Sequence, residues 1–191
     1  THGYTIGGTI VVGEGHIQKL SFATEAPMTE VGDAYNHNAG NGLKYGAPHA
    51  SLTHGYRSGG TGEGSIGQTS SIEKWTFASD ANSAFVANMH GGPGTGDIGS
   101  SSDYHGYIMH TAAAYDKFSF SSDADSVNVG NLFYAPNVRA GSTSSTTHAY
   151  CHGGSYTPND TIQKGAFASD GDMTDVGNII QARAHIWGYQ N

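Results

Sequence analysis

The sequence predicts an all-β fold, a small β-propeller of four blades, and three observations lead to it. A set of short motifs recurs four times along the 191 residues. Large apolar residues alternate with polar ones inside the most regular motif, as they do in half-buried β-strands. The end of the chain resembles the segment that precedes an internal repeat, so the two ends together look like one interrupted repeat.

The first motif is His-Gly-Tyr, and its copies begin at 2, 54, 105 and 148, with His-Ala-Tyr in the fourth. A glycine pair follows two residues later in all copies but the third, which has His110-Thr111. We expect a single domain, 1–191, whose last repeat is completed by the N-terminus. Its repeats cover about 2–53, 54–104, 105–147 and 148–191.

The second motif reads Ile-x-Lys-x-x-Phe-Ala in its commonest form, and four of the five lysines of the chain lie at its third position. An acidic residue follows each copy. A lysine stem can cover a sheet while its amine reaches a carboxylate, so we expect each lysine to meet the acidic residue of its own or the next blade. The lysines are Lys19, Lys74, Lys117 and Lys164, and the acidic residues are Glu25, Asp80, Asp123 and Asp170.

The spacing of the repeats predicts the propeller. The starts lie 52, 51 and 43 residues apart, which is the size of a propeller blade with four short strands. Pairing of the N- and C-terminal strands would close the ring and cover two sheet edges that otherwise promote aggregation. A β-solenoid is the alternative, but a solenoid needs capping repeats at its ends.

Composition argues against several classes of partner. Eight basic against sixteen acidic residues give a net charge of −8, and no segment is dense in Lys or Arg. Phosphate backbones bind clustered cations, so we expect no nucleic-acid partner. No apolar run approaches the ~20 residues of a membrane helix, so we expect no membrane insertion. The single cysteine, Cys151, excludes an internal disulfide.

Taken together, the motifs resemble the tandem kelch-like repeats of phage tail fibres and other virion appendage proteins. The resemblance rests on His-Gly-Tyr-x-x-Gly-Gly, Ile-x-Lys-Phe-x-Phe-Ala-x-Asp and Thr-Asp-Val-Gly-Asn at 174–178, and it covers essentially the whole chain. The sequence departs from the pattern at 86–89, at His110-Thr111 and at Gly165, so blades two and three are expected to be irregular. The resemblance implies kelch-like blades, a virion or extracellular location, and a structural or host-recognition role without enzymatic activity or cofactor.

The expected partners are copies of the chain itself, other virion or appendage proteins, and host-surface glycans. Low charge and a surface rich in Gly, Ser, Thr and Tyr favour hydrogen-bonded contacts, and appendage symmetry favours a homo-oligomer. A soluble secreted lectin and a secreted propeller enzyme are the alternatives. A shallow sugar site needs exposed aromatic rings, for which Tyr35, Trp187 and Tyr189 are candidates by residue type, whereas Trp75 is expected in the core.

Metal binding is the other ligand hypothesis. Equivalent histidines of the four repeats could converge on one metal ion at a fourfold axis; they are His2, His54, His105 and His148. The kelch analogy places them on the second strand of each blade, too far from the axis for bonds of ~2.1 Å. We therefore favour hydrogen bonds from each histidine to a neighbouring loop, and no metal. The oxygen-rich segments 80–82, 123–125 and 170–175 are interpreted as Asx turns rather than calcium loops.

Overall fold

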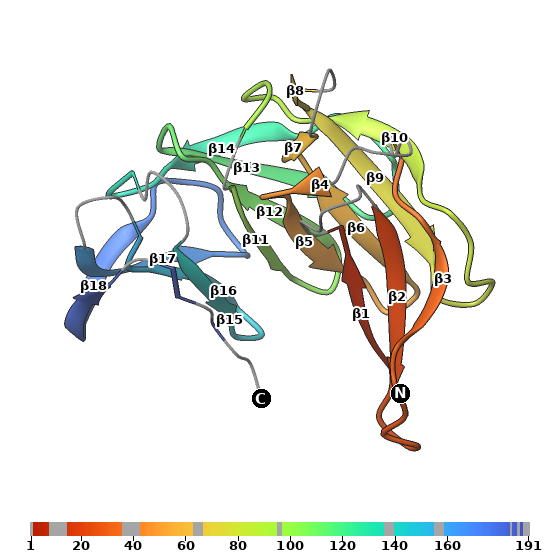
Figure 1. Cartoon of the computed structure of the whole chain (residues 1–191). Helices are drawn as coiled ribbons and strands as arrows, with labels where there is room; N and C mark the ends of the chain where they lie inside the picture. The colour runs from red at the N-terminus through yellow and green to blue at the C-terminus, as the bar shows by residue number, and fades with distance from the viewer. Residues whose placement is uncertain are drawn as a thin grey trace.

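The computed structural model describes residues 2–7, 15–35, 43–62, 67–94, 97–135, 140–154, 159–183, 185, 186 and 188. Within these ranges every regular element is a β-strand, which confirms the predicted all-β class (Figure 1). The same ranges contain no helix long and apolar enough to cross a membrane.

Four antiparallel sheets, here called blades 1 to 4, follow one another along the chain. Blade 1 has three strands, β1 (His2–Ile6), β2 (His16–Ser21) and β3 (Thr29–Asp33). Blade 2 consists of β5 (Ala47–Ala50), β6 (His54–Ser58), β9 (Ser71–Thr76) and β10 (Ala84–Asn88). Blade 3 consists of β11 (Ile98–Ser101), β12 (His105–Met109), β13 (Ala114–Ser119) and β14 (Val127–Asn131).

Blade 4 consists of β15 (Gly141–Ser144), β16 (His148–His152), β17 (Asn159–Ala166) and β18 (Thr174–Arg183). A small fifth sheet joins β4 (Leu43–Lys44), β7 (Thr61–Gly62) and β8 (Gly67–Gln68). The blades lie along an arc, with blade 1 at the right of Figure 1 and blade 4 at the left.

The two repeated motifs occupy the middle of each blade. The strand β11 contacts both β5 and β15, and these three strands form the inner edge of the arc. In blades 2 to 4 the histidine–tyrosine motif lies on the second strand and the lysine motif on the third, as the kelch analogy implies. In blade 1 their counterparts are β1 and β2, the first two described strands. Blades 2 and 3 each have all four strands in order, so the irregularity expected of them does not disturb their sheets.

The structure describes only part of the two terminal segments that are predicted to pair and close the ring. In the described ranges β1 pairs with β2 alone. The other half of the pair would fall on 184–191, of which 185, 186 and 188 are described. Gly188 packs on the inner strand of blade 4, since a Cβ there would lie 2.0 Å from the Ser142 carbonyl oxygen. Closure by terminal strands therefore stays a prediction.

Two contacts repeat at every interface between successive blades. The second-strand tyrosine stacks on a phenylalanine of the next blade with ring centroids 4.7 Å apart, in Tyr4–Phe77, Tyr56–Phe120 and Tyr107–Phe167. The repeat lysine reaches an aspartate of the next blade, at 2.8 Å in Lys19–Asp80 and at 2.5 Å in Lys74–Asp123 and Lys117–Asp170. The lysine prediction is confirmed for these three, and the partner is the next blade.

A third contact comes from the residue that precedes each lysine. This side chain accepts a backbone N–H of the preceding blade, from Tyr35 to Glu73 (2.6 Å), from Gly91 to Asp116 (3.3 Å) and from Tyr134 to Gln163 (2.9 Å). All three acceptors are at most 1% exposed. Since buried acceptors need partners, these bonds hold neighbouring blades in register.

The oxygen-rich segments also act between blades, which corrects the Asx-turn interpretation. Their side-chain oxygens accept backbone N–H groups of the preceding blade, in Asp33 N to Asn82 (2.9 Å), Asn88 N to Asp125 (2.7 Å) and Asn131 N to Asp172 (2.8 Å). Asp175 does form the predicted local turn, since it accepts Gly177 N at 3.0 Å. The spacing of Asp and Asn residues along the sequence does not show whether their oxygens bond within the turn or to a neighbouring blade.

Apolar packing fills the spaces between the sheets. One buried cluster joins blades 2 and 3, and another joins blades 3 and 4. Gly165 belongs to the second, because a Cβ there would lie 3.1 Å from both Tyr115 and Met173. The missing aromatic at Gly165 is thus replaced by Tyr115 of the preceding blade. Trp75 is 5% exposed, which confirms its prediction as a core residue.

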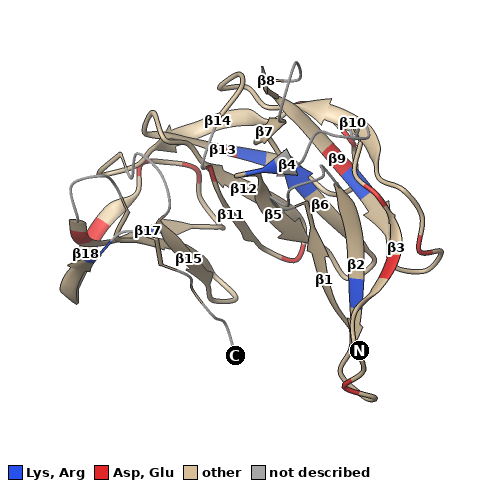
Figure 2. Ribbon diagram, in the orientation of Figure 1, with Lys and Arg blue, Asp and Glu red and all other residues tan. Residues whose placement is uncertain are grey.

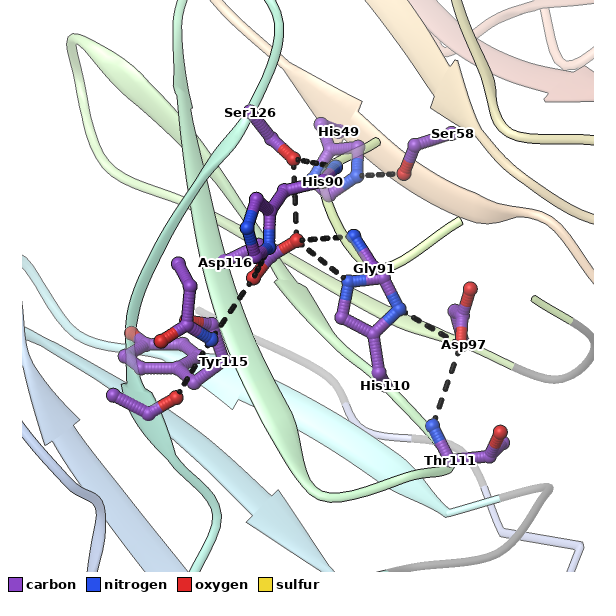
Figure 3. A network of polar contacts seen from close by, with 12 residues as sticks. His49, Ser58, His90, Gly91, Asp97, His110, Thr111, Tyr115, Asp116 and Ser126 are labelled. Carbon is purple, nitrogen blue, oxygen red and sulfur yellow. Dashed lines mark hydrogen bonds and ion pairs between the residues drawn. The ribbon is translucent and has the colours of Figure 1, made fainter. Parts of the chain in front are cut away.

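The departure at His110 introduces a buried charge network (Figure 3). His110 Nε2 lies 2.9 Å from Asp116 Oδ2, and its Nδ1 lies 3.5 Å from Asp97 Oδ1. Asp116 also accepts Ser126 Oγ and Gly91 N. Burial by itself would lower the pKa of His110, but the two carboxylates outweigh it and raise that pKa to about 9. His110 is therefore an imidazolium at neutral pH.

This network predicts a pH dependence of stability. Because the folded pKa of His110 exceeds its unfolded value, its contribution is complete below pH ~6.5 and is lost as the pH rises through about 9. His110→Gln should therefore lose up to about 3 kcal/mol at pH 6 and much less at pH 9.5. Urea unfolding at both pH values measures this, with His90→Gln, an exposed neighbour of Asp116, as control. Equal losses at both pH values would contradict the charged state.

The repeated ring stack predicts unequal effects of equivalent substitutions. Phe120→Ala removes the stack on Tyr56 and should cost about 1–3 kcal/mol. Phe22→Ala changes the same repeat position in blade 1, where the ring is 58% exposed, and should cost less than about 0.5 kcal/mol. Chemical denaturation in dilute protein compares the two variants. Similar losses would mean that the stack adds nothing to stability.

Candidate functional site

A large open cavity lies on the concave side of the arc. Its volume is about 1220 Å³, and its walls come from blades 1 and 2 with contributions from the inner strands of blades 3 and 4. The side chains that line it combine aromatic rings with hydroxyl groups and few charges. The Lys and Arg residues of its lining are Lys19, Lys44 and Arg57, which lie on β2, β4 and β6, and Figure 2 shows a blue segment on each of these strands.

Aromatic rings form one wall of the cavity. Tyr4 stacks on Phe77, and Trp75 meets Phe77 edge to face with centroids 6.4 Å apart. Tyr45 stands at the rim with 45% of its surface exposed, and Lys44 Nζ lies 5.9 Å from its ring centroid. Rings of this kind offer flat apolar faces that are only partly covered by the protein.

Hydroxyl groups from the inner strands form the opposite wall, contributed by Ser100, Ser101, Ser142, Thr143 and Ser144. The Ser142 hydroxyl donates to the Gly99 carbonyl at 2.7 Å, which ties β15 to β11. The Ser100 hydroxyl is buried and has no hydrogen-bond partner within the described ranges. Backbone and side-chain oxygens are thus concentrated along the inner edge.

Two buried polar side chains of the cavity lining, His49 and Arg57, add little net charge to it. His49 Nδ1 lies 3.1 Å from the Ser100 carbonyl, and its Nε2 lies 2.8 Å from the Ser58 hydroxyl. Burial lowers the pKa of His49 to about 4, so the ring is uncharged at neutral pH. Arg57 Nη1 donates to Glu73 Oε1 at 2.6 Å in a buried ion pair. The cavity therefore offers hydrogen bonds and ring faces more than charge.

Of the residues predicted for sugar binding, the structure places only Tyr35, and Tyr35 does not line this cavity. Tyr35 follows β3 outside it, where its ring lies 5.7 Å from that of Phe85 and its N–H is bonded to Glu73. Trp187 and Tyr189 fall outside the described ranges. The sequence did hold one signal for the cavity: Lys44 is the one lysine away from the repeat position, and it lies beside Tyr45 at the rim.

The four repeat histidines each lie on a different sheet. In two copies the ring bonds locally, from His54 Nδ1 to Thr53 Oγ1 and from His148 Nδ1 to Thr147 Oγ1, both at 2.8 Å. These contacts agree with the preferred interpretation of the histidines as local anchors. The only group of possible metal ligands that comes together in the described part of the chain is His16, Glu30 and Asp33.

Comparisons with known proteins extend the description of the fold. No family model matches the chain, and no curated protein matches it. Among solved structures, YjhT, a kelch-repeat propeller protein, is similar with a TM-score of 0.71 at 10% identity over 88% of this chain and 60% of YjhT. The computationally designed propeller Ika8 is similar with a TM-score of 0.53 at 11% identity, over 90% of this chain and 47% of Ika8. The chain thus spans about half to three fifths of these proteins, and its fold is a kelch-like β-propeller.

Proposed function

We propose that the chain is a non-enzymatic structural and adhesion module of a phage virion or another extracellular appendage, and that it binds host-surface glycans in the concave cavity. One observation carries the glycan part of this proposal. Partly exposed aromatic rings at Tyr4, Tyr45 and Phe77 face the same cavity as a row of serine hydroxyls on the inner strands.

The chemistry of sugars suits such a cavity. A pyranose ring has apolar C–H faces that pack on aromatic rings, and its rim of hydroxyls both donates and accepts hydrogen bonds. Ligand sites commonly combine apolar walls with a few fixed polar groups that set orientation.

The non-enzymatic part of the proposal is supported by the state of the reactive side chains. Burial raises the pKa of the Cys151 thiol to about 12, so it is protonated and a poor nucleophile. His110 and His49 have both ring nitrogens engaged with neighbouring groups. The virion or appendage location is supported by the repeat motifs, whereas a free secreted lectin would use the same cavity.

Glycan binding is tested by screening the intact protein on a glycan array and measuring the best ligand by calorimetry. Tyr45→Ala should weaken binding at least about tenfold, because it removes the exposed ring at the rim. Tyr104→Ala changes a tyrosine that is 74% exposed on the β11–β12 turn outside the cavity, and should leave affinity unchanged. No binding by the unaltered protein, or equal losses in both variants, would reject the cavity as a glycan site.

A further inference from the structure

Blade 1 exposes side chains whose equivalents are buried in the other three blades. Gln18 is exposed, although the corresponding Glu73, Asp116 and Gln163 are at most 1% exposed. Met28 is 38% exposed, although the corresponding Ser83, Ser126 and Met173 are 7%, 3% and 2% exposed.

Phe22 extends this pattern. It is 58% exposed, whereas the equivalent rings of the other blades stack on a tyrosine of the preceding blade. We call Gln18, Phe22, Glu25 and Met28 the end face of blade 1. In the other blades these positions contact the preceding blade, so this face has the composition of an interface and no blade upon it.

Blade 4 shows the other half of the same interface. Tyr150 and Lys164, which we call the end face of blade 4, correspond to the tyrosines and lysines that contact the next blade elsewhere. Within the described ranges Lys164 makes no ion pair, and Tyr150 has a ring contact only with His148 of its own strand. The outer strand β18 beside them is exposed, with Val176 at 46% and Ile180 fully so.

The two end faces are complementary in residue type and charge. Glu25 occupies the repeat position of the aspartates that receive a lysine, and its backbone φ of 48° matches 45° at Asp80 and 47° at Asp123. The turn is therefore already in the conformation that accepts an ammonium group from a preceding blade. Within the part of the chain that the structure describes, Phe22 has no tyrosine stacked on it, and Tyr150 can supply that ring. Glu25 in the same part has no lysine paired with it, and Lys164 can supply that cation.

The arc keeps these faces of one chain apart. Blades 1 and 4 stand at its two ends in Figure 1. The end faces of the two blades therefore do not meet within the described part of one chain.

We infer that the end face of blade 4 of one copy binds the end face of blade 1 of a second copy. Tyr150 stacks on Phe22, Lys164 pairs with Glu25, and Gln18 and Met28 become buried as their equivalents are. Such a head-to-tail contact is heterologous, so it builds either a closed ring of copies or an open filament. The inference does not depend on glycan binding.

The test uses charge reversal in trans. Lys164→Glu and Glu25→Lys should each weaken self-association of the full chain at least threefold, because each places like charges face to face. An equimolar mixture of the two variants should recover association, since the substituted side chain of one copy then meets a substituted side chain of opposite charge on the other. Sedimentation velocity over a concentration series measures all three samples.

A second variant tests the apolar part. Phe22→Asp should weaken self-association at least tenfold, whereas Tyr104→Asp, which changes an exposed ring on an internal blade, should leave it unchanged. Circular dichroism and thermal unfolding of dilute samples establish that each variant is folded. A protein that is monomeric at every concentration, or one whose association survives Phe22→Asp, overturns the inference. Failure of the mixture to recover would mean that Lys164 and Glu25 do not meet across the contact, and would overturn the inference as well.

Discussion

The contact between successive blades is the constraint on which the rest of this structure depends. Each sheet has short strands and cannot bury its faces alone, so it is held by what the next sheet supplies. The same positions do this at each interface: a tyrosine–phenylalanine stack, a lysine–aspartate pair and a buried acceptor for a backbone N–H. The sheet hydrogen bonds set the shape of a blade, and these side chains set the angle between blades.

The His110 network shows how one interface can vary without losing this arrangement. Asp116 lies at the repeat position of the buried acceptor and bonds Gly91 N of the preceding blade. His110 replaces the first glycine of the repeat pair and adds a positive charge between Asp116 and Asp97. In blade 2 the equivalent Glu73 is instead neutralised by Arg57. Two different cations thus satisfy the same buried acidic position.

Much of the fold follows from the sequence because the repeat multiplies every signal. Four copies of the lysine motif predict a strand more firmly than one copy would, and the acidic residue that follows each copy predicts the ion pairs. The segments that line the cavity share no such motif, since β5, β11 and β15 read APHA, IGSS and GSTS. The position of an inner strand depends on how neighbouring blades pack together. A site formed by inner strands therefore has no short sequence motif by which it could be predicted. The segment around Asn82 likewise has the sequence of an Asx turn, although the side chain of Asn82 accepts a hydrogen bond from another blade.

The use of equivalent side chains at successive interfaces has an evolutionary consequence. A blade that carries the tyrosine, the lysine and the acidic turn fits between any two others, because each neighbour presents the same counterparts. Unequal recombination that duplicates or deletes one whole repeat would then yield a chain that still folds. The number of blades, and with it the size of the molecule, would then change in a single genetic event.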